Sequence, residues 1–232
     1  MRRFVLILLF LFCHFVRLSF ALDPSTAIKN YVHLNYKSKQ GLRQDSVLSI
    51  TQTKDGYLWI GDYQGVTRFD GIRFVPLEMP ENTDFYMRTI NALFCDSRGD
   101  LWIVTMEGLF RFDGDKVTRY TKADGLNDSW VYSIAEDPAG NLWLGTHRGI
   151  SKWNGKSFTK YPPEELGGTK YIHAISVDPD STVWAGTQDG LLIFENGKWK
   201  SITERDGLAN NAVWSIVRDE DGSHWIATEG GL

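Results

Sequence analysis

Residues 140–155 read GNLWLGTHRGISKWNG, and this short stretch decides the fold that we predict. Trp143 stands three residues after one glycine and six residues before another, and the stretch ends on the pair Asn154-Gly155. Asn-Gly favours a two-residue hairpin turn because both central positions need a positive φ. The runs beside the turn alternate apolar and polar residues, as half-buried strands do. The stretch therefore predicts a tight antiparallel hairpin.

The same arrangement recurs along the chain. The tryptophan returns at intervals of 41 to 43 residues, at Trp59, Trp102, Trp143, Trp184 and Trp225. The later glycine of each copy is Gly65, Gly108, Gly149, Gly190 or Gly231. The turn pair of the first four copies is Asp70-Gly71, Asp113-Gly114, Asn154-Gly155 or Asn196-Gly197. So many matched positions mark an internal repeat.

One repeat contains four short strands, which in the first copy we expect at about 47–51, 58–61, 66–69 and 73–77. A four-stranded antiparallel unit of about 40 residues is the blade of a β-propeller. The predicted fold is therefore all-β, a propeller of four-stranded blades with about five repeats present and the ring incomplete. We expect the five repeat tryptophans to be core residues that pack between neighbouring blades, since burial of a large apolar side chain stabilises a fold.

The first 21 residues form a separate segment, which we interpret as a signal peptide. Arg2 and Arg3 precede an apolar run at 4–12, and Ser19 and Ala21 supply the small residues of a cleavage site. An uncleaved anchor is the alternative, although the apolar run is short for a membrane span. Residues 22–232 are then a partial propeller, with an outer strand at 31–36, four blades at about 46–203 and a partial fifth blade at 212–232. We expect further repeats after this stretch.

Charge and cysteine content exclude several function classes. Without Arg2, Arg3 and Arg17, 22 of the 25 basic residues remain against 29 acidic ones, a net charge of about −7. Such a chain is a poor nucleic-acid binder, because phosphate contacts need clustered Lys and Arg. Once the signal peptide is removed, Cys95 is the single cysteine, so no internal disulfide is expected.

The sequence contains none of the familiar catalytic motifs, and its histidines do not have metal-ligand spacing. We expect no catalytic residue, no metal ligand and no cofactor in this stretch. Propellers keep function in their loops. The candidate ligand-binding residues follow the tryptophan strands: Tyr63, Glu107, His147, Arg148, Gln188, Asp189 and Glu229. The loops between blades, at 81–88, 127–130, 167–171 and 209–211, form a second candidate set. Both sets should gather on one face, where they suit a polar small molecule or a sugar.

The repeat resembles a known family. Residues 46–50 (SVLSI), 55–61 (DGYLWIG) and 140–146 (GNLWLGT) look like two-component regulator propeller repeats. The resemblance implies the N-terminal periplasmic sensor region of a membrane-bound histidine kinase or diguanylate cyclase, located at the inner membrane. It implies a small-molecule or carbohydrate ligand, and it leaves open a homodimer formed through C-terminal regions outside this sequence. Membrane association would come only through the signal segment or a downstream helix, and any kinase or cyclase activity would belong to a downstream domain.

Two other functions stay open. A streptogramin-lyase-like propeller enzyme shares the G-x-x-W strand pattern and needs a catalytic histidine with acidic partners. His147 with Glu107 and Glu229 would be the best candidates for that role. The other alternative is a secreted scaffold that binds proteins or carbohydrates.

Overall fold

The computed structural model describes residues 34–79, 90–169 and 171–232. The chain divides into two units, Met1–Asn35 and Tyr36–Leu232. Only the second unit is described over most of its length, and it contains all the strands that follow. The predicted signal peptide and the 81–88 loop lie outside the described residues. Across the part of the chain that is described, no helix has the length and apolar character needed to span a bilayer.

The second unit is built from successive antiparallel sheets, here called blades. Blade 1 contains β1 (Val47–Gln52), β2 (Leu58–Asp62), β3 (Gly65–Phe69) and β4 (Phe74–Pro76). Blade 2 contains β5 (Ile90–Cys95), β6 (Leu101–Thr105), β7 (Gly108–Phe112) and β8 (Val117–Tyr120). Blade 3 contains β9 (Val131–Glu136), β10 (Leu142–Thr146), β11 (Gly149–Trp153) and β12 (Phe158–Tyr161). Blade 4 contains β13 (Ile172–Val177), β14 (Val183–Thr187), β15 (Leu191–Glu195) and β16 (Lys198–Ile202). Blade 5 contains β17 (Val213–Arg218) and β18 (His224–Thr228).

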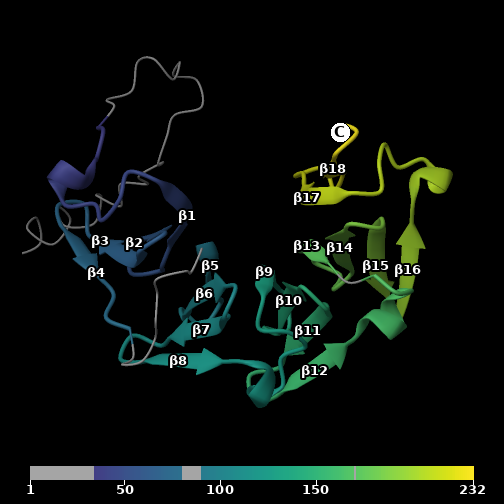
Figure 1. The fold of residues 1–232 in the computed structure, drawn as a ribbon, viewed down its shortest axis with the longest axis horizontal. Helices are drawn as coiled ribbons and strands as arrows, with labels where there is room; N and C mark the ends of the chain where they lie inside the picture. Colours follow the sequence, from purple (N-terminus) through teal and green to yellow (C-terminus); the bar gives the residue numbers. More distant parts are fainter. Residues whose placement is uncertain (1–33, 80–89, 170) are drawn as a thin grey trace, which may run out of the picture. The chain divides into compact units, whose positions relative to one another are not determined.

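Strand order within each sheet follows the order of the chain, and every pairing is antiparallel. The first strands of neighbouring blades contact one another in sequence, from β1 to β5, β9, β13 and β17. Figure 1 shows these sheets following one another from β1 to β18, and the described strands form no closed ring. The predicted fold class is confirmed. The boundaries proposed for the individual domains stay predictions.

The repeat tryptophans of the middle blades form the core between blades. Trp102 is fully buried and packs with Leu142, Leu144 and Trp153 of blade 3. Its indole Nε1 also donates a hydrogen bond of 3.0 Å to Asp96, six residues earlier. The same bond recurs in the next three blades, at Asp137, Asp178 and Asp219, and blade 1 uses Thr53 instead. Each of these five tryptophans is therefore fixed within its own blade by a hydrogen bond, and those of blades 1 to 4 pack against the following blade.

Trp225 departs from the expected core role, because its side chain is 54% exposed. Trp59, Trp102 and Trp143 are each at most 4% exposed. The physical reason is that a repeat tryptophan is buried by the next blade, and the described residues place no further blade over β18. Trp225 keeps the hydrogen bond to Asp219, at 3.0 Å, so its orientation is that of the other copies.

One short 3-10 helix precedes blade 1 and three others connect successive blades, and they were not expected from the sequence. They are η2 (Ser38–Gln40), η3 (Lys122–Asp124), η4 (Pro163–Leu166) and η5 (Glu204–Asp206). Each is capped by a left-handed glycine. Before η2, Tyr36 stacks edge-on against Phe69 and Phe74 of blade 1, as Tyr120 before η3 packs on Trp153 and Phe158.

Tyr36 thus takes the place of an outer-strand residue. The outer strand expected at 31–36 is not formed at residues 34–36, and residues 31–33 lie outside the described part. A strand needs a hydrogen-bonded neighbour, and none of the described strands pairs with these residues.

Candidate ligand-binding site

The hairpin after the second strand of each blade has a fixed internal geometry. In blade 3, Thr146 Oγ1 donates to the Gly149 carbonyl at 2.8 Å and accepts from the Arg148 amide at 3.2 Å. Blades 2, 4 and 5 repeat the first of these bonds at Thr105, Thr187 and Thr228. The hydroxyl satisfies the turn internally, so the two residues between the threonine and the glycine are held at the surface.

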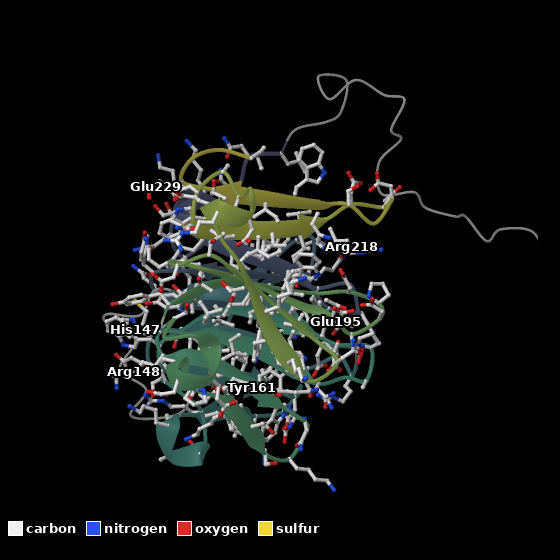
Figure 2. All side chains as sticks on the ribbon, turned by 90° about the vertical axis from the view of Figure 1, so that its right-hand side faces the viewer. His147, Arg148, Tyr161, Glu195, Arg218 and Glu229 are labelled. Carbon is white, nitrogen blue, oxygen red and sulfur yellow. The ribbon has the colours of Figure 1, made fainter. Side chains whose placement is uncertain are left out.

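This hairpin lies beside the start of the first strand of its own blade, because β9 and β10 are antiparallel. Val131 pairs with Thr146, and the His147 amide donates to the Trp130 carbonyl at 2.9 Å. In Figure 2, His147, Arg148 and Glu229 lie on one side of the molecule, opposite Arg218 and Glu195. The hairpins of blades 3 and 5 therefore share one face with the loops that enter the blades.

Six aromatic side chains from three successive blades meet on this face, and we call them the ring array: Trp130, Tyr132, His147, Tyr171, His173 and Trp214. His147 lies between Trp130 and Tyr171, with centroid distances of 4.8 and 4.5 Å and near-perpendicular rings. His173 lies between Tyr171 and Trp214, at 6.5 and 4.3 Å. The array is continuous across blades 3, 4 and 5.

Exposed rings and imidazoles alternate along the array. Trp130, Tyr171 and Trp214 are 42%, 39% and 52% exposed, and each comes from a different blade. The two imidazoles between them are half-buried. Tyr132 completes the array. Its ring centroid lies 6.4 Å from that of His147 and 6.1 Å from that of His173. Three large aromatic side chains, one from each blade, are thus partly open to solvent, and the half-buried imidazoles pack between them.

Hydrogen bonds fix the imidazoles. The Tyr132 hydroxyl lies 3.1 Å from His147 Nδ1, and Gln188 Oε1 lies 3.4 Å from His173 Nε2. Burial lowers the pKa of His173 below its ordinary value of 6.5, against the opposing effect of the Gln188 hydrogen bond. Burial, then the neighbouring Tyr171 and Asp128, raises the pKa of Tyr132 above 10.0. At neutral pH, His173 and Tyr132 are therefore uncharged, which suits stacking on a neutral ligand.

Of the seven predicted binding residues, the structure brings two into contact with the array, His147 and Gln188. Tyr63 is exposed in the β2–β3 hairpin, and Glu107 occupies the β6–β7 hairpin. Arg148 and Asp189 are exposed beside His147 and Gln188, and the Glu229 amide bonds to the Ala212 carbonyl at 3.0 Å. These five stay predicted candidates at the edge of the face.

One of the two acids proposed for a lyase-type site, Glu107, contacts a side chain of its own blade. Glu107 forms an ion pair with Arg119 at 3.7 Å. The hydrogen-bond partner of His147 is the phenol of Tyr132 rather than a carboxylate. The geometry at His147 therefore matches ring packing, and it does not reproduce the histidine with acidic partners that a lyase would need.

Sequence reasoning selected His147 by name, and it included Trp130 and Tyr171 within the candidate loops 127–130 and 167–171. It missed the other three array residues, Tyr132, His173 and Trp214. A signal was present in the repeat register. At 13 and 11 residues before the repeat tryptophan, blades 3, 4 and 5 carry Trp130 and Tyr132, Tyr171 and His173, and Ala212 and Trp214. The first two repeats have Ser46 and Leu48, and Thr89 and Asn91, at the same places.

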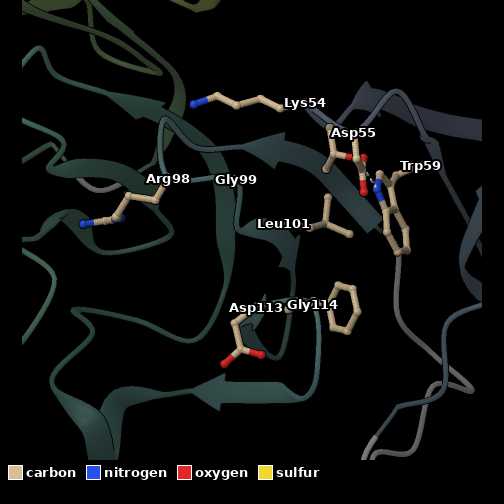
Figure 3. A pocket seen from close by; sticks show the side chains of 10 residues that line it. Lys54, Asp55, Trp59, Arg98, Gly99, Leu101, Asp113 and Gly114 are labelled. Carbon is tan, nitrogen blue, oxygen red and sulfur yellow. Dashed lines mark hydrogen bonds between the residues drawn. The ribbon is translucent and has the colours of Figure 1, made fainter.

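A second concave region lies between blades 1 and 2, at the β1–β2 turn of blade 1 and the β5–β6 and β7–β8 turns of blade 2. This cleft of about 230 Å³ has an apolar floor of Trp59, Leu101 and Phe112. Figure 3 shows the ends of Lys54 and Arg98 directed away from Trp59. Both cations are engaged elsewhere, Lys54 with the Ser97 carbonyl and Arg98 with Asp96 at 3.2 Å. The cleft therefore offers fewer ligand-binding groups than the ring array.

Comparison with known proteins agrees with the repeat. The family model described as two component regulator propeller matches residues 41–64, 125–148 and 207–230. The middle match includes β9, β10 and His147, so it covers part of the ring array. No curated protein sequence matches the chain.

Solved structures share the fold at low sequence identity. One is the extracellular domain of a protein assigned as a hybrid two-component system from B. thetaiotaomicron, with 24% identity, a TM-score of 0.72, and coverage of 84% of this chain and 29% of that one. Virginiamycin B lyase from Staphylococcus aureus has 18% identity, a TM-score of 0.61, and coverage of 80% and 68%. PorZ, a surface component of the type-IX secretion system of Porphyromonas gingivalis, has 16% identity, a TM-score of 0.63, and coverage of 80% and 31%.

The chain spans less than a third of the B. thetaiotaomicron domain. These identities show the fold alone. Three of the repeats match the two component regulator propeller model, as the sequence resemblance predicted, so the chain contains repeats of this type.

Proposed function

We propose that this propeller is the extracytoplasmic ligand-sensing region of a two-component-type receptor, and that the ring array is its binding surface. The observation that carries the proposal is the exposure of one large aromatic ring from each of blades 3, 4 and 5. Exposed aromatic rings gathered in one patch mark interaction sites more often than single exposed residues do. Their faces stack on the apolar faces of ring-shaped ligands, which fits a small polar ring or a carbohydrate.

The extracytoplasmic location is part of the proposal. It is supported by the basic and apolar N-terminal segment of the sequence and by the extracellular origin of the B. thetaiotaomicron neighbour. A receptor also needs an output domain, so we expect the complete gene to encode a membrane span and a kinase or cyclase domain beyond the propeller. Sequencing of the complete gene checks this, and a secreted propeller without a span would contradict it.

Ligand binding is tested with the soluble second unit on an array of glycans and peptides. We expect a ring-bearing glycan to bind the wild type, and the triple variant Trp130→Ala, Tyr171→Ala, Trp214→Ala to lose at least tenfold in affinity. That loss corresponds to about 1.4 kcal/mol, within the range reported for stacking contacts.

Trp225→Ala is the matched control, because Trp225 is 54% exposed, like Trp214, but has no place in the array. Equal losses in the control and in the triple variant would contradict a binding role for the array. Binding of peptides alone would instead support a protein-interaction scaffold.

A further inference from the structure

His173 joins rings from three blades and is the best-placed titratable group in the array. It lies on β13 with its ring parallel to Tyr171 within 5°, and tilted by 32° against Trp214 of blade 5. Tyr132 of blade 3 lies on another side, at 6.1 Å. A change in the charge of this imidazole, which belongs to blade 4, therefore also acts on a ring of blade 3 and a ring of blade 5.

The hydrogen bond to Gln188 identifies the nitrogen that gains a proton. An amide oxygen can only accept, so the 3.4 Å contact with Gln188 Oε1 places the hydrogen of the neutral ring on Nε2. Nδ1 is then the basic nitrogen. Protonation at Nδ1 places a positive charge among Tyr132, Tyr171 and Trp214.

The groups that face His173 offer little compensation for that charge. From blade 3 they are Tyr132, with Asp128 near its hydroxyl, and His147 with the exposed Arg148 beside it. From blade 4 they are Tyr171, Gln188 and the exposed Asp189, and from blade 5 Trp214. Lys170 lies outside the described residues.

Among the described residues, no ion pair joins His173 to an acid. His224, which contacts Asp178 at 3.0 Å, shows the contrasting arrangement. An indole face does attract a cation. Burial of the imidazole opposes this attraction, and it lowers the pKa of His173 against the effect of the Gln188 hydrogen bond. The charged form is therefore the less stable one in this packing, and it is favoured by movement of the ring toward water.

We propose that the ring array is controlled by protons: uncharged His173 holds Tyr171 and Trp214 in the binding arrangement, and a proton on Nδ1 separates His173 from Trp214. The effect on ligand binding rests on the proposed function, whereas the change in packing does not. In an exported region, such a group would couple ligand binding to the external pH.

Packing is tested without a ligand, by tryptophan fluorescence between pH 8 and pH 5. The chain has nine tryptophans, so the emission of Trp214 cannot be read directly. The Trp214 signal is therefore the fluorescence of the wild type minus that of Trp214→Phe at each pH. We expect this signal to change with a midpoint below pH 6.5, and to be flat in His173→Gln, which keeps a polar side chain that cannot be protonated in this range. His224→Gln is the matched control and should keep the transition.

A difference signal that is constant from pH 8 to pH 5 would overturn the proposal, and so would an unchanged transition in His173→Gln. Far-UV circular dichroism on the same samples reports the fold as a whole. Equal loss of the fold in the wild type and in His173→Gln at pH 5 would also contradict control by His173.

Binding is tested on the same glycan array at pH 7.5 and pH 5.5. We expect the affinity of the wild type to fall by up to about tenfold for each pH unit below the midpoint, and that of His173→Gln to stay constant. If no glycan binds at either pH, the proposed ligand class fails while the fluorescence result still decides the change in packing. If glycans bind equally at both pH values, control of binding by His173 is excluded.

Discussion

Asp62 stands where blades 2 to 5 carry the hairpin threonine. Its Oδ1 accepts the Gln64 amide at 2.6 Å, which reproduces one of the two threonine bonds. A carboxylate cannot donate the other bond, the one to the glycine carbonyl. Asp62 is fully buried, and its Oδ2 has no hydrogen-bond partner among the described residues. An unsatisfied buried polar atom costs about 1–3 kcal/mol.

Asp62→Thr should therefore stabilise the propeller by about 1–3 kcal/mol, since it restores a donor to the Gly65 carbonyl. Chemical denaturation of the second unit measures this. The reverse exchange in blade 3, Thr146→Asp, is the matched control and should destabilise. A lower stability of Asp62→Thr would show that the carboxylate has a role that the hairpin geometry does not reveal.

The repeat tryptophans allow a second comparison between residues of one type. Trp102→Ala should destabilise by about 3–5 kcal/mol, because it empties a fully buried site between blades 2 and 3. Trp225→Ala should cost clearly less, since its side chain is 54% exposed. Thermal unfolding of both variants provides the test. Similar costs for the two would mean that Trp225 is covered in solution.

Among the elements, the hairpin of blade 3 shows why the repeat keeps a glycine six residues after the tryptophan. Gly149 has φ +98°, and a Cβ there would collide with the Tyr161 carbonyl. Gly56 has a similar φ of +90°, but a Cβ there would meet nothing within 4 Å.

Gly149→Ala should therefore cost more than Gly56→Ala. Gly56→Ala carries only the backbone strain, about 1 kcal/mol, whereas Gly149→Ala also displaces β12. Denaturation midpoints at equal m-values measure the difference. Equal costs would indicate that β12 moves away freely.

The strands could be predicted from the sequence, but the site could not. Spacing placed the first strands at 47–51 and 58–61, and they are observed at Val47–Gln52 and Leu58–Asp62. The strands follow from local alternation. The expected two-residue turn forms in blade 4, where Asn196 and Gly197 both have positive φ, whereas four residues join the third and fourth strands of blades 1 to 3. The ring array depends on which blades are neighbours and on the direction of each side chain. His147 and Gln188 could be predicted because they follow the tryptophan strands. Trp214 lies on β17, the first strand of blade 5, and its prediction would have needed to know which side of that strand is exposed.

For the whole unit, the interfaces between neighbouring blades, here called joints, differ in chemistry. Between blades 4 and 5, one carboxylate contacts side chains of both blades. Asp178 accepts the Trp184 indole at 2.9 Å and contacts His224 at 3.0 Å and Arg218 at 3.3 Å. His224 also stacks on Trp184 at 4.1 Å. Between blades 2 and 3, the carboxylate that crosses the interface is Glu136, which accepts hydrogen bonds from the Ser97 amide and hydroxyl at 2.7 and 2.6 Å.

Asp178→Ala should loosen blade 5 selectively, because it removes the partner of the Arg218 guanidinium, of the His224 imidazole and of one indole. Hydrogen exchange measured by mass spectrometry should rise in β17 and β18 by tenfold or more and stay unchanged in β5 to β8. Asp221→Ala, on the same joint but exposed, is the matched control and should leave the exchange rates near those of the wild type. Uniform exchange in all blades of Asp178→Ala would contradict a local role.

The central claim is that the ring array is the ligand-binding surface of this propeller. A crystal structure of the second unit with a ligand selected on the glycan and peptide array tests it most directly. The account predicts a ligand ring against at least two of Trp130, Tyr171 and Trp214. A ligand bound in the cleft between Trp59 and Phe112, with the array uncovered, would contradict it.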